Sequence, residues 1–199
     1  MARYTGPKWR INRRENAVVK GTSEKWRKRP TAPGMHGHRR SRYGEYMVQF
    51  REKQKVKRTY GMLEKQFRRF FKLARKSTGN TGTRLLQLLE LRLDNVVFRL
   101  GFANTRDQAR QLVTHGHITL NGKKHNIPST ILNAGDEIAF TDKFSKTDIF
   151  KLTKEELSSV PVPEWLSKLA KGGKVTAEPT REMMDPSIRE QLIIELYSK

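Results

Sequence analysis

The sequence predicts an α+β fold that is mainly helical, with an extended basic N-terminal arm, a helical lobe, and a module of two helices plus a β-hairpin. Three observations lead to this prediction. The first 44 residues are rich in Gly, Pro and basic side chains and show little periodicity. Later segments repeat apolar residues at spacings of three and four, the pattern of amphipathic helices. One short segment instead alternates apolar and polar residues and ends in Asn121-Gly122, a strong hairpin signal.

The positive charge is concentrated in the N-terminal part of the chain. The chain has 199 residues and a formal net charge of +21. Residues 1–84 carry 25 Lys and Arg against 5 Asp and Glu, whereas residues 85–199 carry 16 against 15. An even distribution would serve solubility, but a concentration of one sign is typical of a surface that binds phosphates. We therefore expect a polyanionic partner.

Composition excludes several classes of protein. The chain has no cysteine, which rules out disulfides and thiolate metal sites. No apolar run approaches the roughly 18–20 residues of a membrane span. The first ten residues, MARYTGPKWR, lack the apolar core of a signal peptide. These features predict a soluble intracellular protein with no membrane partner.

The arm, residues 1–44, combines cations with aromatic rings. Trp9, Trp26 and Tyr43 are interleaved with short basic clusters at Arg13-Arg14, Arg27-Lys28-Arg29 and Arg39-Arg40. Two interpretations stay open. The rings stack on unpaired bases while the cations follow the backbone, or they pack as a small core under the arm. The segment buries too little apolar surface to order by itself, so we expect it to order on a partner.

Residues 45–76 predict two helices separated near Gly61. Tyr46, Phe50 and Lys53 lie at helical spacing in the first. The second has an apolar stripe, expected to be core, that comprises Leu63, Phe67, Phe70, Phe71 and Ala74. Its opposite face is basic, with Glu64 as the only acid, and contains Lys65, Arg68, Arg69, Lys72 and Arg75. Residues 77–83, STGNTGT, predict a linker.

Two short helices are predicted next. The first has one apolar face, formed by Leu93, Val96, Val97 and Leu100. Gly101 stands where a left-handed C-cap belongs. Thr105 and Gln108 have the spacing of a capping box, which starts the second helix. That helix presents Arg106 and Arg110 one turn apart.

A hairpin follows the second helix. In His117 to Leu120 the apolar side chains of Ile118 and Leu120 face one way, and Lys123 and Lys124 come directly after the turn. Residues 136–140, DEIAF, predict another strand with Ile138 and Phe140 inward. The helix arginines, the turn lysines and His117 are expected to converge on a surface suited to RNA shape and phosphates. Helix-turn-helix DNA readers expose similar arginines, so DNA stays an alternative.

The residues of this module carry a resemblance. Residues 92–129, RLDNVVFRLGFANTRDQARQLVTHGHITLNGKKHNIPS, closely resemble the RNA-binding module named after ribosomal protein four of the small subunit. The module also occurs in pseudouridine synthases, tyrosyl-tRNA synthetases and heat-shock RNA binders. MARYTGPKWR, YGMLEKQFRRFF, VPEWL and PTREMMDPSIREQLIIELYSK, in this order, resemble the bacterial-type ribosomal protein family itself. The resemblance covers nearly the whole chain.

The resemblance implies a domain organisation and a function. It implies an arm of residues 1–44, a helical lobe of residues 45–91 plus 156–199, and an inserted RNA-binding module of residues 92–155. It implies a structural constituent of the small ribosomal subunit, in the cytoplasm, that binds the 5′ domain of 16S ribosomal RNA directly and nucleates assembly. It also implies contact with ribosomal protein five, linked to decoding accuracy, and a place with ribosomal proteins three and five where messenger RNA enters.

The candidate RNA-binding residues lie in three regions. In the arm they are Arg3, Lys8, Trp9, Arg10, Arg13, Arg14, Arg27, Lys28, Arg29, Arg39, Arg40 and Arg42. In the two following helices they are Lys53, Lys57, Arg58, Arg68, Arg69 and Lys72. In the module they are Arg92, Arg106, Arg110, His115, His117, Asn121, Lys123 and Lys124. The last helix is expected to dock on the helical lobe through an apolar face of Ile188, Leu192, Ile193 and Leu196.

The chain departs from the family pattern in its metal ligands. Many family members hold zinc in the arm through four cysteines, and this chain has none. His36-Gly37-His38 has no acid or sulfur close by, so we expect no metal and no cofactor. Leu91 stands where the family often has a basic residue, so one phosphate contact is expected to be missing there.

Catalysis is not expected, nor is a small-molecule substrate. The chain has no cysteine nucleophile, Gly-rich phosphate loop or HExxH motif. Asp94, near Arg92 and Arg99, favours a structural ion pair over a catalytic carboxylate. Two alternatives to the ribosomal role stay open: a stand-alone RNA chaperone or heat-shock-type RNA binder, and a DNA-binding regulator.

Overall fold

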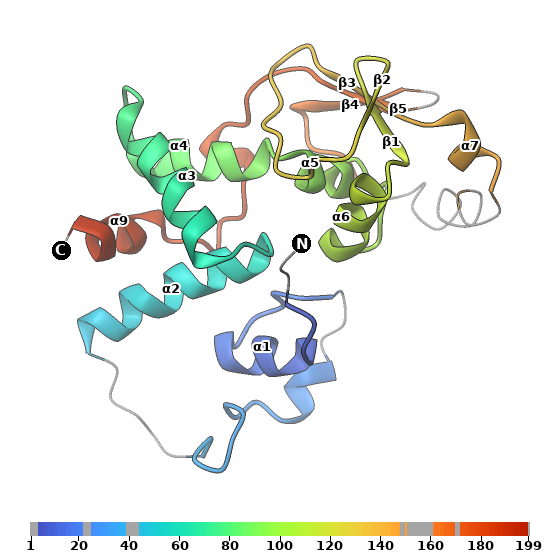
Figure 1. Cartoon of the computed structure of the whole chain (residues 1–199). Coiled ribbons are helices and arrows are strands. Elements are labelled where there is room, and N and C mark those ends of the chain that lie inside the picture. Colours follow the sequence, from blue (N-terminus) through green and yellow to red (C-terminus); the bar gives the residue numbers. More distant parts are fainter. Residues whose placement is uncertain are drawn as a thin grey trace. The chain divides into compact units, whose positions relative to one another are not determined.

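The chain folds as two units (Figure 1). The first comprises residues 1–85 and 185–199, and the second residues 86–184. The computed structural model describes residues 4–21, 25–38, 44–147, 150, 161–169 and 172–198. The expected module boundary at residue 155 lies outside the described residues.

The first unit is helical. Its helices are α1 (Lys8–Glu15), α2 (Glu45–Thr59), α3 (Glu64–Lys76), the first half of α4 (Thr81–Glu90) and α9 (Glu190–Ser198), with a 3-10 turn, η1 (Lys25–Lys28). The linker predicted at residues 77–83 is wrong in its second half, where α4 begins at Thr81. The Asn80 side chain accepts the N–H groups of Gly82 and Thr83 at 2.8 and 3.3 Å, which caps the helix.

Part of the basic arm is helical, which the sequence did not predict. Helix α1 has eight residues and buries Ile11 and Asn12. An isolated helix of this length is marginal in water, so packing within the unit decides its stability. Charge and the Gly and Pro content of the arm gave no sign of that packing.

Aromatic residues of α3 form the core of the first unit, as predicted. Phe67, Phe70, Phe71 and Ala74 are buried, whereas Leu63 is 43% exposed because it lies before the first turn of α3. Helix α9 packs beside α2 (Figure 1). Ile188 and Ile193 are buried, and Leu192 and Leu196 are half-buried. The predicted docking of the tail is confirmed.

One carboxylate joins three helices of this unit. Glu64 at the start of α3 accepts hydrogen bonds from Lys53 and Lys57 of α2, both at 2.7 Å, and from the Tyr197 hydroxyl of α9 at 2.9 Å. Partial burial raises the pKa of Glu64, but these three hydrogen bonds outweigh it and hold the pKa at about 2. Burial and the bond to Glu64 raise the pKa of Tyr197 well above its usual value. The charged carboxylate therefore stabilises the packing of α2, α3 and α9.

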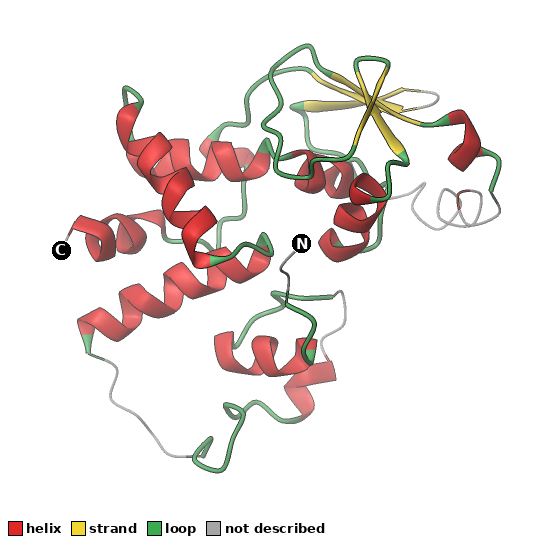
Figure 2. Ribbon diagram, in the orientation of Figure 1, coloured by secondary structure: helices red, strands yellow, loops and turns green. Residues whose placement is uncertain are grey.

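The second unit packs helices against a five-stranded antiparallel sheet (Figure 2). Its helices are α5 (Leu93–Arg99), α6 (Arg106–Thr114) and α7 (Asp142–Ser145), with a 3-10 turn, η2 (Arg181–Met183). Its strands are β1 (Ile118–Leu120), β2 (Lys123–His125), β3 (Glu137–Phe140), β4 (Leu166–Leu169) and β5 (Gly172–Val175), in the order β2-β1-β3-β5-β4. The core contains Ile118, Ile138 and Trp165.

Local signals in this unit are confirmed. Asn121 and Gly122 have φ angles of 50° and 78°, as a hairpin turn of the predicted kind requires. Gly101 is left-handed, with a φ of 73°. The Thr105 side chain accepts the N–H of Gln108 at 3.2 Å, which starts α6. The Gln108 side chain bonds back to the N–H of Asn104 and not to that of Thr105, so the box is closed one residue earlier than its standard form.

The expectation that residues 156–199 belong to the helical lobe needs correction. Strands β4 and β5 extend the sheet of the second unit, with β5 paired to β3. Two glycines permit this pairing: a Cβ on Gly172 would lie 2.1 Å from the Ile138 carbonyl oxygen, and one on Gly173 would lie 2.5 Å from the Leu100 side chain. Only the segment from residue 185 returns to the first unit.

The docking of α9 gives a first prediction. Ile193→Ala should lower the free energy of unfolding by about 2–5 kcal/mol, because it empties a fully buried site. Gln191→Ala, on the exposed side of the same helix, should change it by about 0.5 kcal/mol at most. Urea unfolding followed by circular dichroism measures both. Equal stability of the two variants would mean that α9 does not dock in solution.

Glu64 gives a second prediction, on pH dependence. Its pKa is lowered from 4.5 to about 2, so its contribution to stability is present above pH 4.5 and is lost as the pH falls towards 2. The difference in unfolding free energy between wild type and Glu64→Gln should be constant above pH 5 and shrink below it. Urea titrations at several pH values between 2 and 7 test this, and a pH-independent difference would contradict it.

Candidate nucleic-acid interface

One face of α3 is a continuous row of exposed cations. Its six members, which we call the α3 basic face, are Lys65, Arg68, Arg69, Lys72, Arg75 and Lys76. Each has another member three or four residues away, so they lie on one side of the helix, opposite the buried phenylalanines. Among the described residues, no carboxylate lies within ion-pair distance of any of them. Lys76 was not predicted, although it continues the same spacing.

The three predicted cations of α2 differ from these, because each is bound within the unit. Lys53 and Lys57 bind Glu64, and Lys53 is buried. Arg58 pairs with Glu15 of α1. Their first role is therefore to hold helices together, and we withdraw the buried Lys53 from the candidate interface.

The cations in the described part of the arm also fall into two sets, those that are exposed and those that bind other residues of the unit. Lys8, Trp9 and Arg10 are exposed on α1, and Arg27, Lys28 and Arg29 are exposed on or just after η1. Arg13 instead donates from Nε to the carbonyl of Thr31 at 2.9 Å, and Arg14 to that of Pro33 at 3.2 Å. Arg3, Arg39, Arg40, Arg42 and Tyr43 lie outside the described residues, as does the side chain of Trp26.

A buried ion pair lies at the start of α5 in the second unit and also contacts α6. Asp94 is 4% exposed and accepts two hydrogen bonds from Arg92, which is 1% exposed, at 3.0 and 2.6 Å. Arg110 reaches across from α6 and donates to the same carboxylate at 2.9 Å. The predicted pair of Asp94 with Arg92 is confirmed. Arg92 is too deeply buried for RNA to reach it, so we withdraw it from the interface as well.

Asn95 links a second set of charges to α6. Its amide nitrogen donates to the Glu90 carboxylate at 2.7 Å, and its oxygen accepts from Nε of Arg106 at 2.8 Å. The predicted pair of Asp94 with Arg99 is wrong, because Arg99 binds Glu90 through two hydrogen bonds of 3.0 and 2.7 Å. The Arg106 guanidinium lies 4.5 Å over the Phe98 ring. Arg106, the first residue of α6, and Arg110, one turn later, are thus held in fixed positions.

The hairpin brings together several predicted residues. Asn121, Lys123 and Lys124 are exposed at the β1–β2 turn. The Lys124 side chain lies over Gly116, where a Cβ would be 2.4 Å from its Cε. This places the Lys124 ammonium near His115 and His117. Burial lowers the pKa of His117, and the charges of His115 and Lys124 lower it further.

Metal and membrane features are not found in the described residues. Within those ranges, no three His, Cys, Asp or Glu side chains gather closely enough to bind a metal ion. No helix in the described part of the chain has the length and apolar character of a membrane span.

Comparison with known proteins points to one family. A family model described as "Ribosomal protein S4/S9 N-terminal domain" matches residues 3–90, and one described as "S4 domain" matches residues 91–138. The β4–β5 hairpin lies beyond the second match. The chain is 50% identical to "Small ribosomal subunit protein uS4" of Caldicellulosiruptor saccharolyticus and of Herpetosiphon aurantiacus, and 47% identical to that of Saccharopolyspora erythraea. In each comparison the whole of both chains is covered.

The buried pair generates a third prediction. Asp94→Asn should lower the stability of the second unit by about 3–5 kcal/mol, because it leaves the Arg92 guanidinium buried without a counter-charge. Asp142→Asn, an exposed site on α7, is the control and should change stability little. Urea unfolding of the full chain measures both, and an Asp94→Asn variant as stable as the control would show that the pair is dispensable.

Proposed function

The chain belongs to the ribosomal protein S4 family, and from this premise we propose that it is a structural constituent of the small ribosomal subunit that binds 16S ribosomal RNA. The family is structural and not enzymatic. The match covers the N-terminal half as well as the RNA-binding module, which favours the ribosomal role over a stand-alone RNA chaperone.

The observation that carries the proposal is the α3 basic face. Six exposed cations on one side of the helix, with no carboxylate partner among the described residues, form a surface that an external anion can neutralise. Many phosphates in sequence, as in an RNA backbone, fit such a row better than a single small anion does. The row carries no base-reading aromatic residue, so it suits a contact that positions the RNA.

The module supplies a second RNA contact in this proposal. Arg106 at the start of α6, Arg110 one turn later, and Asn121, Lys123 and Lys124 at the hairpin turn belong to the segment that matches the S4 domain. The positive end of the α6 dipole adds to the field of Arg106 and favours phosphate there. His115 and His117 lie between the end of α6 and the start of β1, with their ring centroids 6.0 Å apart.

The finer assignments follow from the family resemblance alone. They are direct binding to the 5′ domain of 16S ribosomal RNA, nucleation of subunit assembly, contact with ribosomal protein five linked to decoding accuracy, and a position with ribosomal proteins three and five where messenger RNA enters. The location that goes with them is the cytoplasm. Binding of the purified chain to a 5′-domain transcript, and its co-sedimentation with the small subunit through a high-salt wash, test the main assignments.

The α3 basic face gives a fourth prediction. Replacing Arg68 and Arg69 by Ala should weaken binding to a 5′-domain transcript and flatten the slope of log affinity against log salt by about 1.4–1.8, since each phosphate contact releases roughly 0.7–0.9 of a counterion. Lys143→Ala with Lys146→Ala removes the same charge from an exposed site in and beside α7 and should leave the slope unchanged. Filter binding between 50 and 300 mM salt measures the slopes. Equal slopes for the two variants would refute a phosphate contact on α3.

A further inference from the structure

Helix α1 exposes an aromatic ring among cations. The Trp9 side chain is 40% exposed, whereas Trp165, in the core of the second unit, is 2% exposed. Lys8 and Arg10, the neighbours of Trp9, are exposed on the same helix. The exposed part of the Trp9 ring, with a cation on either side in the sequence, is available for contact with an external partner.

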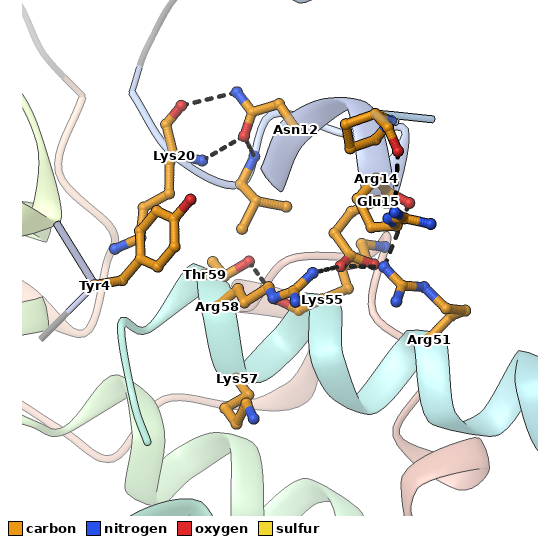
Figure 3. Close-up of polar contacts among 12 residues, drawn as sticks. Tyr4, Asn12, Arg14, Glu15, Lys20, Arg51, Lys55, Lys57, Arg58 and Thr59 are labelled. Atoms are coloured by element: carbon orange, nitrogen blue, oxygen red, sulfur yellow. Dashed lines mark hydrogen bonds and ion pairs between the residues drawn. The ribbon is translucent and has the colours of Figure 1, made fainter. Parts of the chain in front are cut away.

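Glu15, at the other end of α1, fixes this helix to α2. The Glu15 side chain is 1% exposed, and Arg51 and Arg58 both bind its carboxylate from α2. Arg51 also reaches the carbonyl of Arg14 at 3.4 Å. Figure 3 shows the two arginine side chains reaching from α2 to the end of α1. Moving α1 away from α2 would leave the buried Glu15 carboxylate without its two guanidinium partners. The cost of that uncompensated charge keeps the two helices together.

The segment after α1 is held by a second contact. Asn12 is fully buried, and its side chain closes the loop after the helix: the oxygen accepts the N–H groups of Val19 and Lys20 at 3.1 and 2.9 Å, and the nitrogen donates to the Lys20 carbonyl at 2.8 Å (Figure 3). Residue Asn16 takes the left-handed conformation that ends the helix. Helix α1 therefore has a defined orientation on its unit before any partner binds.

The charge around α1 selects the partner. Glu15 is the only acid of α1, and its charge is taken up by Arg51 and Arg58. Lys8, Trp9 and Arg10 are exposed at the first turn of the helix. An apolar protein surface does not need these cations, and a duplex backbone offers no base to the ring. An unpaired base with a phosphate on either side satisfies both the ring and the cations.

We propose that Trp9 is a stacking platform for an unpaired base of RNA, with Lys8 and Arg10 beside it for the adjacent phosphates, and that Glu15 is the positioning residue that holds the platform ready. The inference rests on the proposed RNA-binding function and adds the class of RNA recognised: single-stranded at α1. The two surfaces of the first unit then have different tasks, because the α3 basic face has cations without an exposed aromatic ring.

The first test compares ring substitutions on three RNA probes. The probes are the 5′-domain transcript, an unstructured 12-nucleotide RNA, and a blunt RNA duplex of 16 base pairs. Trp9→Ala should weaken binding to the first two by about 5- to 150-fold, the range for loss of one base–aromatic stack. Binding to the duplex should not change, and neither should the salt slope, because stacking releases no counterion. Trp9→Phe keeps a stacking ring and should retain most of the affinity.

The second test concerns Glu15. Glu15→Gln should make α1 susceptible to trypsin in the free protein and should weaken binding to the single-stranded probe. If Glu15 acts through the platform, the double variant Glu15→Gln with Trp9→Ala should bind no more weakly than Trp9→Ala alone. Glu164→Gln, at an exposed site of the second unit, is the charge-matched control. Circular dichroism melting confirms that the variants are folded.

The results of these binding experiments distinguish a failure of the Trp9 platform from a failure of the proposed RNA-binding function. If the wild-type chain binds none of the three probes, the proposed RNA-binding function fails. If it binds them and Trp9→Ala binds equally well, or loses affinity equally on the duplex, the platform is wrong while RNA binding stands. Additive effects of Glu15→Gln and Trp9→Ala would overturn the positioning role of Glu15.

Discussion

The fold depends on a shortage of negative charge. A chain with a net charge of +21 repels itself on compaction, and three of its carboxylates each neutralise two cations. Glu15 binds two arginines, Glu64 binds two lysines, and Asp94 binds two arginines. These acids lie where helices meet: Glu15 between α1 and α2, Glu64 between α2 and α3, and Asp94 between α5 and α6. The same ion pairs thus neutralise charge and join helices.

Because carboxylates are few, the cations that they bind inside the protein are distinguishable from the cations that remain exposed to RNA. Lys53, Arg58 and Arg92 look in the sequence like members of a basic surface, yet they are bound inside the unit that contains them. The α3 basic face has only Glu64 on its helix, and that acid is already engaged by α2. In the first unit, the cations of the α3 basic face are therefore distinct from the cations that bind carboxylates inside the protein. In the second unit the two roles meet in one residue, because Arg110 binds Asp94 and is also a proposed phosphate contact.

The sequence predicts features that depend on residues close together in the chain, and it does not predict contacts between distant segments. The α3 stripe, the Gly101 cap, the Thr105 cap and the Asn121-Gly122 turn depend on neighbours within a few residues, and each is confirmed. The β4–β5 hairpin was missed because its pairing with β3 depends on the absence of side chains at Gly172 and Gly173, which local patterns do not signal. The partner of Arg99 was assigned wrongly because Asp94 is nearer in sequence, whereas Glu90 is nearer in space. Contacts between distant segments, such as Glu15 with Arg58, left no pattern at all.

The arm of this chain has no thiolate metal site. The family resemblance implies zinc held by four cysteines in this region of many members, and the present chain has no cysteine. The described part of its arm is instead fixed by hydrogen bonds and one ion cluster: Asn12 closes the loop that follows α1, Arg13 binds the Thr31 carbonyl, and Glu15 binds α2. The Glu15 cluster draws two of its three members from α2, so here the orientation of α1 is coupled to the folding of the helical unit. Loss of the α2 packing would then release the arm, and the order of the arm reports on the stability of the unit that carries it.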